Sequence, residues 1–294
     1  MNHQTNAHQP ILVLGGTGKT GRRIAEKLSS RGCSVRIASR SAEPAFSWED
    51  SSNWQSLLEG VHSVYINFAP DLAIPGAADA IQAFVDLAIQ KGVKRAVLLS
   101  GRGEEEAQKC EAIVQRDEWE WTVVRASWFA QNFSEGAFVE MVQAGVVALP
   151  AGDIKEPFVD IEDIAEVAVA AFTESGHDKK IYEVTGPQLL TFSEAIACIS
   201  EASGRHIHYE QIPTEAFIEG AKQQGLPKEV TWLLNYLFTH VLDGRNAHLT
   251  HGIEEALGRK PASFMEYAKR TAATGIWSER EKSELQEQTM SKAL

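Results

Sequence analysis

The sequence predicts an α/β fold in which a doubly wound parallel sheet carries a smaller, mainly helical C-terminal lobe. The first half of the 294 residues alternates short β-rich runs with helical patterns, and such units form a parallel sheet covered on both faces. After about residue 133 the patterns become mostly helical. We therefore expect a sheet domain over 10–150 that is completed by a strand at 181–184, a substrate-binding lobe over 151–277, and a flexible tail over 278–294.

The elements of the first half follow from β-rich runs and helical spacing. The run Ile11–Leu14 stops abruptly at glycines, and Ile24 and Leu28 lie four residues apart, as on one helix face. Ile81 and Val85 repeat this spacing. The first half is thus predicted to contain strands at 11–14, 34–38, 61–67, 94–99 and 121–125, and helices at 22–31, 77–90 and 104–115.

The second half contains one clear helix-start signal. Thr191 is followed three residues later by Glu194, just before an apolar-periodic run, which is the pattern of a capping box. We expect the remaining helices at 160–175, 214–224, 228–240 and 263–272, with short strands at 181–184 and 206–210.

Composition excludes several function classes. A net charge of −12 disfavours binding to nucleic acids and anionic lipid surfaces. No apolar run reaches the roughly 20 residues that span a bilayer, and the first ten residues lack the apolar region of a signal peptide. Three widely spaced cysteines without a CxxC fit a reducing compartment. We expect a cytoplasmic monomer or homodimer with a small-molecule substrate and no metal, nucleic-acid or membrane partner.

The most informative segment is the glycine-rich turn after the first strand. Glycines at 15, 18 and 21 stand between a strand and a helix, where missing side chains and free N–H groups suit a pyrophosphate. This pattern predicts dinucleotide binding, and a plain tight turn is the alternative. A triphosphate-binding P-loop is excluded, because the glycine it needs five residues before Gly18 is Val13.

The residues after the second strand favour NADP(H) over NAD. No acidic residue lies between Glu26 and Glu43, so the usual partner of the ribose 2′-hydroxyl is missing. The strand ends in Ser39 and Arg40, a hydroxyl and a guanidinium that suit a 2′-phosphate, with Arg36 and Arg22 as further candidates. Solvated arginines at a sheet edge are the alternative interpretation.

Three motifs are informative when taken together. They are Gly15-Gly-Thr-Gly-Lys-Thr-Gly21, Val93-Lys-Arg-Ala-Val-Leu-Leu-Ser100 and Trp121-Thr-Val-Val-Arg-Ala-Ser-Trp-Phe-Ala-Gln-Asn-Phe133. With them the chain resembles, over about residues 10 to 277, the NmrA-like branch of the atypical short-chain dehydrogenase/reductases. Within that branch it is most similar to bacterial relatives of ergot-alkaloid reductases of the festuclavine dehydrogenase type. The resemblance implies a Rossmann-type fold, bound NADP(H) and a C-terminal lobe that shapes a substrate cleft, in a family that mixes reductases with regulators that bind the cofactor.

The resemblance also implies cofactor-binding residues by position. One group holds the pyrophosphate, a second the 2′-phosphate, and a third lines the ribose and nicotinamide side. These groups are Gly15, Thr17, Gly18, Lys19 and Thr20; Ser39 and Arg40; and Asn67, Phe68 and Ala69.

Catalytic candidates are few. No tyrosine is followed four residues later by lysine, so the usual proton-transfer pair of short-chain dehydrogenases is absent. Ser100 ends a predicted strand and is either a ligand contact or a polar strand end. Lys109 lies near the place where some relatives carry a catalytic lysine, or it is a surface lysine. The run Glu104-Glu105-Glu106 is interpreted as a solvated helix start.

Aromatic residues of the second half are candidates for a pocket wall. Trp128, Phe129 and Tyr236 either line an apolar substrate pocket or belong to the lobe core. The sequence thus predicts an NADPH-dependent oxidoreductase that transfers hydride to a small or medium hydrophobic carbonyl, imine or activated alkene. An iminium carbon or activated double bond already carries the electron demand, so orientation supplies much of the rate. The alternative is a non-catalytic NADP(H)-sensing regulator.

Overall fold

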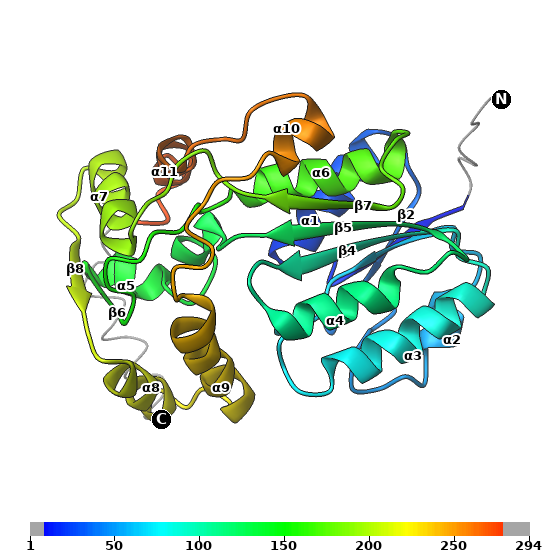
Figure 1. The fold of residues 1–294 in the computed structure, drawn as a ribbon, viewed down its shortest axis with the longest axis horizontal. Coiled ribbons are helices and arrows are strands. Elements are labelled where there is room, and N and C mark those ends of the chain that lie inside the picture. The colour runs from blue at the N-terminus through cyan, green and yellow to red at the C-terminus, as the bar shows by residue number, and fades with distance from the viewer. Residues whose placement is uncertain (1–8, 279–294) are drawn as a thin grey trace.

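The computed structural model describes residues 9–278, and its main feature is a parallel sheet (Figure 1). In this part of the chain six strands lie in the order β2-β1-β3-β4-β5-β7, and every neighbouring pair is parallel. The strands are β1 (Ile11–Leu14), β2 (Val35–Ala38), β3 (Ser63–Ile66), β4 (Arg95–Gly101), β5 (Glu120–Ala126) and β7 (Lys180–Val184). The predicted doubly wound parallel sheet is confirmed.

Successive side chains of each strand point to opposite faces of the sheet, and an apolar core lies on each face. In β1, Leu12 and Leu14 pack with the helices on one side, whereas Val13 packs with those on the other. The first side is covered by α2 (Trp54–Leu57), α3 (Ala77–Gln90) and α4 (Glu105–Val114), and the second by α1 (Lys19–Ser30), α6 (Ile161–Thr173) and α10 (Gly252–Leu257). Figure 1 shows α4 and α6 on opposite sides of the strands.

The strand order creates a switch point beside β1. The chain passes from β1 to β2 on one side and then returns to place β3 on the other side. In open α/β sheets, ligands bind outside the carboxyl ends of the strands at such a point. The loops that follow β1, β2, β3 and β4 therefore border the expected binding crevice.

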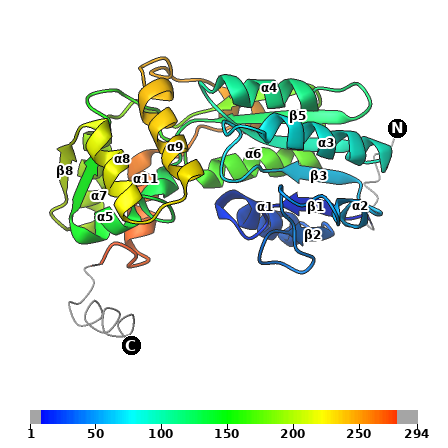
Figure 2. The same ribbon diagram turned by 90° about the horizontal axis from the view of Figure 1, so that it is seen from below.

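The C-terminal lobe gathers at one end of the molecule (Figure 2). Its small sheet pairs β6 (Val146–Leu149) with β8 (His208–Gln211) in parallel. Phenylalanines dominate its core, including Phe133, Phe158 and Phe192. The other lobe elements are the 3-10 turn η1 (Ala130–Phe133), α5 (Val139–Ala144), α7 (Phe192–Ser203), α8 (Thr214–Gln223), α9 (Lys228–Tyr236), the π turn η2 (Leu237–Val241) and α11 (Phe264–Ala272).

Local signals explain how the lobe helices begin. Thr191 and Glu194 form both hydrogen bonds of the predicted capping box at the start of α7, and Ser263 and Glu266 do the same for α11. After α11, Trp277 is fully buried, and its indole N–H donates to the Phe133 carbonyl at 2.8 Å. The last described residues thus complete the lobe core.

The packing does not follow the expected division at residue 150. Strand β6 lies in the lobe although it precedes that residue, because its hydrogen-bonding partner is β8. Conversely, α6, β7 and α10 pack on the main sheet, with Ile164, Tyr182 and Ile253 in its core. The tail predicted over 278–294 lies outside the described residues except for Ser278. No helix within 9–278 is long and apolar enough to cross a membrane.

Candidate cofactor and substrate site

The glycine loop after β1 is closely packed and leaves the start of α1 open. Gly15 has a φ of +65°, and a Cβ there would lie 2.7 Å from the Asn67 Nδ2. A Cβ on Gly21 would lie 2.3 Å from the Gly15 carbonyl oxygen. The N-cap residue Gly18 places no side chain over the first turn of α1, whose N–H groups have no partner within the helix. Such a helix start suits a diphosphate.

Two of the three polar residues of this loop reach the crevice. Thr17 is exposed, and its hydroxyl donates to the Ser39 Oγ at 2.9 Å. Lys19 is half-buried; its Nζ donates to the Asn132 Oδ1 at 3.0 Å and lies 5.9 Å from the centroid of the Phe129 ring. Burial lowers the pKa of Lys19, so an anion beside it would favour its charged form. Thr20, by contrast, is buried.

Of the three arginines that are candidates for the 2′-phosphate, Arg40, which lies just after β2, is the one whose guanidinium is available to a ligand. Its side chain is exposed and forms no hydrogen bond or ion pair with another described residue, whereas Ser39 is buried against Thr17. The other two candidates have partners. Arg36 donates to the carbonyls of Leu57 and Glu59 at 2.6 and 2.9 Å, and Arg22 forms an ion pair with Glu135.

After β3, the predicted ribose-side residues differ in exposure. Asn67 is half-buried against Gly15, and its carbonyl accepts a hydrogen bond from the Trp48 indole at 3.2 Å. Phe68 is mostly buried and packs on the Trp48 ring, with centroids 4.9 Å apart. Ala69 is exposed. Asn67 and Ala69 therefore border the crevice, whereas Phe68 supports it from within the core.

The two predicted catalytic residues are not brought to the crevice. Ser100 is buried, and its hydroxyl donates to the Glu111 Oε1 at 2.6 Å, because the alternation of β4 turns this side chain toward α4. Glu111 is itself paired with Arg125 on β5. Lys109 lies on the solvent side of α4 with 63% of its side chain exposed, and it pairs with Glu106.

Two carboxyl groups that the sequence analysis missed lie at the carboxyl ends of β3 and β4. Asp71 follows β3, Glu104 follows β4, and the two carboxyl groups act on each other's pKa. Burial raises the pKa of both groups, and the Asp71 charge raises the pKa of Glu104 further. The predicted solvated run is therefore wrong for Glu104, which is buried, although Glu105 is exposed. The available signal was the position of Glu104 just after a strand end.

The three predicted pocket residues lie in different surroundings. Trp128 packs against Phe192 and Phe238 at 5.3 Å from each ring and belongs mainly to the lobe core. Phe129 lies beside Lys19. Tyr236, on α9, is half-buried in a stack of rings with Trp232 at 5.5 Å and His240 at 5.4 Å.

Tyr236 faces the turn between β4 and α4. Burial raises the pKa of its phenol, and the charges of Glu104 and Glu105 raise it further, so these groups are near one another. The segment after α9 also docks on this turn: Asn246 donates to the Arg102 carbonyl at 3.2 Å, and Arg245 donates to the Gly103 carbonyl at 3.3 Å. The lobe thus covers the sheet edge at the point where Glu104 lies.

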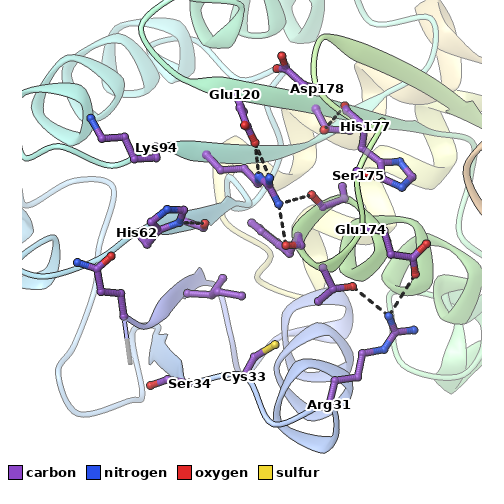
Figure 3. A pocket seen from close by; sticks show the side chains of 18 of the residues that line it. Arg31, Cys33, Ser34, His62, Lys94, Glu120, Glu174, Ser175, His177 and Asp178 are labelled. Atoms are coloured by element: carbon purple, nitrogen blue, oxygen red, sulfur yellow. Dashed lines mark hydrogen bonds and ion pairs between the residues drawn. The ribbon is translucent and has the colours of Figure 1, made fainter. Parts of the chain in front are cut away.

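A separate cavity of about 900 Å³ opens at the opposite edge of the sheet (Figure 3). It is lined by residues at the beginnings of strands, including His62 and Arg95. One of its cations, Arg95, pairs with Glu120 and donates to the carbonyls of Ala171 and Phe172. This cavity lies away from the glycine loop.

Comparison with known proteins agrees with this geometry. The NmrA-like family model matches residues 7–271. The chain belongs to the NmrA-like family. YesF of Bacillus subtilis, named as an uncharacterized oxidoreductase, is 32% identical over 92% of this chain and 98% of its own length. Festuclavine synthase II of Penicillium roqueforti is 30% identical over 88% of this chain and 97% of its own.

Solved structures of other proteins also resemble the fold of this chain. The triphenylmethane reductase of Citrobacter sp., complexed with NADP(H), has a TM-score of 0.69 at 18% identity, covering 89% of this chain and 99% of that one. At this identity the match shows the fold alone. The family, fold, enzyme class and cofactor named in these comparisons agree with the sequence predictions.

Proposed function

We propose that this NmrA-like protein is an NADPH-dependent reductase of a small or medium hydrophobic carbonyl, imine or activated alkene. The observation that carries the proposal is the open start of α1 behind the close-packed glycines, with the exposed Arg40 one strand away. A diphosphate fits the first element and a 2′-phosphate fits the second.

The residues of the chain would hold the cofactor in an extended arrangement. The first turn of α1, with Thr17 and Lys19, binds the pyrophosphate, while Arg40 binds the 2′-phosphate. The opposite half of the cofactor then extends past Asn67 toward the ends of β3 and β4. NADPH supplies a hydride there when bound.

The lobe provides the surface that faces this edge. The ring stack of Trp232 and Tyr236 on α9 and His240 on η2 is partly exposed, and Trp232 has 42% of its surface accessible. Flat apolar side chains of this kind favour planar, hydrophobic substrates. The lobe orients such a substrate and excludes water from the sheet edge.

A substrate panel tests the proposal. Purified protein is mixed with NADPH and with ketones, aldehydes, imines, quinones and enones, and NADPH absorbance is followed over time. Consumption that depends on one of these classes supports the reductase. Tight NADPH binding without consumption across the panel would instead favour the regulator that only senses NADP(H).

A further inference from the structure

The pair formed by Asp71 and Glu104 sits where the proposed reaction needs a proton. Strands β3 and β4 are neighbours in the sheet, so the residues that follow them meet at one place on its carboxyl edge. The two carboxyl groups are close enough there to act on each other's pKa. The glycine loop follows β1, the next strand along, and Asn67, which touches that loop, is four residues before Asp71.

The contacts of Asp71 and Glu104 indicate which of the two carboxyl groups is protonated. The Asp71 Oδ1 accepts a hydrogen bond from the Ala73 N–H at 2.8 Å, which stabilises an ionised carboxylate. The Glu104 Oε2 is buried and has no hydrogen-bond partner among the described residues. Two neighbouring carboxylates repel each other, so at rest Glu104, whose Oε2 has no partner in the described chain, holds a proton, and Asp71, which accepts from the Ala73 N–H, carries the charge. The same repulsion drives Glu104 to regain a proton after it has given one up.

Neither carboxyl group forms an ion pair with another residue in the described part of the chain. The titratable groups near the pair are Glu111 and Cys110 of α4 and Tyr236 of α9. The cation on this side, Arg245, donates to the Gly103 carbonyl and is paired with Asp243. The Glu104 carboxyl also lies in the space next to Gly101, where a Cβ would come within 2.2 Å of its Oε1. Its surroundings therefore favour the neutral acid.

We propose that Glu104, assisted by Asp71, is the catalytic acid that protonates the substrate atom left with an electron pair after hydride transfer. This inference rests on the proposed function. For an aldehyde, the carbonyl carbon gains the hydride with its two electrons, the carbonyl oxygen gains the Glu104 proton, and an alcohol and NADP⁺ result. The ionised Glu104 then regains a proton from solvent.

The other groups near this edge are less suited to the role. Burial and nearby carboxylates raise the pKa of the Tyr236 phenol, which makes it a weaker acid than usual. The Ser100 hydroxyl is engaged with Glu111, and Lys109 is on the solvent side of α4. A general acid must hold its proton at the working pH, and burial, which raises the pKa of the Glu104 carboxyl, favours the protonated form.

The first test compares two substrates that differ in their need for a proton. An aromatic aldehyde needs a proton on oxygen, whereas a triphenylmethane dye cation accepts hydride on carbon and needs none. Glu104→Gln keeps the shape of the side chain and removes the acid. We expect kcat for the aldehyde to fall by about 100- to 10,000-fold and the rate with the dye to stay within about twofold.

Glu105→Gln is the matched control, because Glu105 is the adjacent exposed glutamate. It should leave both rates unchanged. Equal losses on both substrates in Glu104→Gln, or an unchanged aldehyde rate, would overturn the assignment. If the wild-type protein reduces neither substrate class, the reductase proposal fails, and the proton-holding pair is judged by the second test.

The second test needs no turnover. Infrared spectra at neutral pH are recorded for the wild-type protein and both variants without substrate. The difference between wild type and Glu104→Gln should contain the carbonyl band of a protonated carboxylic acid that shifts in heavy water, and the Glu105→Gln difference should lack it. Without this band in the first difference, Glu104 is ionised and cannot be the acid.

Discussion

Replacing Gly21 by alanine should loosen the glycine loop from α1. A Cβ there would lie 2.3 Å from the Gly15 oxygen, 2.8 Å from the Gly15 carbonyl carbon and 2.9 Å from the Gly16 Cα, whereas ordinary contacts begin at 3.4 Å. All three are backbone atoms, so no side chain can rotate away, and the helix and loop must separate by about 1 Å.

The expected cost follows from this displacement. Because the three clashing atoms are backbone, we take the upper part of the range for overpacking, about 2–3 kcal/mol. The better helix propensity of alanine offsets about 1 kcal/mol, which leaves a net cost of about 1–2 kcal/mol. We expect Gly21→Ala to lower Tm by about 2–8 °C in thermal unfolding. The start of α1 moves with the helix, so the Kd for NADPH in calorimetric titration should rise at least about tenfold.

Gly220→Ala is the matched control, since Gly220 lies within α8 and its Cβ would have no atom within 4 Å. The same substitution should raise stability there by about 0.5–1 kcal/mol. A Gly21→Ala protein as stable as wild type, or equal losses in both variants, would refute the packing that we describe.

Three further predictions use other parts of the molecule. Arg40→Ala should weaken NADPH binding by about 1.5–3 kcal/mol, with little change for NADH, in calorimetric titration. Arg125→Met leaves Glu111 buried without its cation and should lower the free energy of unfolding by about 3–5 kcal/mol in denaturant titration. Lys109→Met removes only an exposed ion pair and should leave Tm and turnover unchanged. Burial raises the pKa of Glu156 from 4.5 to about 7, so the folded protein holds a proton that the unfolded chain releases. Stability should therefore fall as pH rises from about 4.5 to 7, and Glu156→Gln should remove up to about 3 kcal/mol of this dependence in unfolding measurements across that range.

Each of these has an outcome that would contradict it. Equal losses of affinity for NADPH and NADH would show that Arg40 does not bind the 2′-phosphate. A stable Arg125→Met protein would show that the buried ion pair contributes little, and lost turnover in Lys109→Met would restore the sequence prediction for that residue. Identical pH profiles for Glu156→Gln and wild type would mean that Glu156 is ionised in the folded protein.

Local sequence signals predicted much of the fold. The run Ile11–Leu14 and the capping box of Thr191 depend on neighbouring residues alone, and both appear in the structure where the sequence places them. Strand β6 was not predicted, because only four residues form it and its partner β8 lies about 60 residues later.

Side-chain partners were harder to foresee than elements. The sequence indicated a polar group at Ser100, but it did not indicate that the Ser100 hydroxyl donates to Glu111 on α4. Likewise, Glu104 resembles its neighbours Glu105 and Glu106 in type, and only the turn after β4 separates it from solvent and brings it to Asp71. Such pairings depend on the three-dimensional approach of distant segments, which residue spacing does not encode.

The burial of Trp277 has a consequence for the order in which the protein forms during translation. The sheet strands, which end with β7 at Val184, can assemble while the ribosome is still adding the remaining chain. The lobe cannot, because its core needs α11 and the Trp277 indole, which bonds to the Phe133 carbonyl from 144 residues earlier. The strands of the main sheet are therefore complete first, and α10 joins their core later. The phenylalanines of the lobe core stay uncovered until α11 and Trp277 have been synthesised.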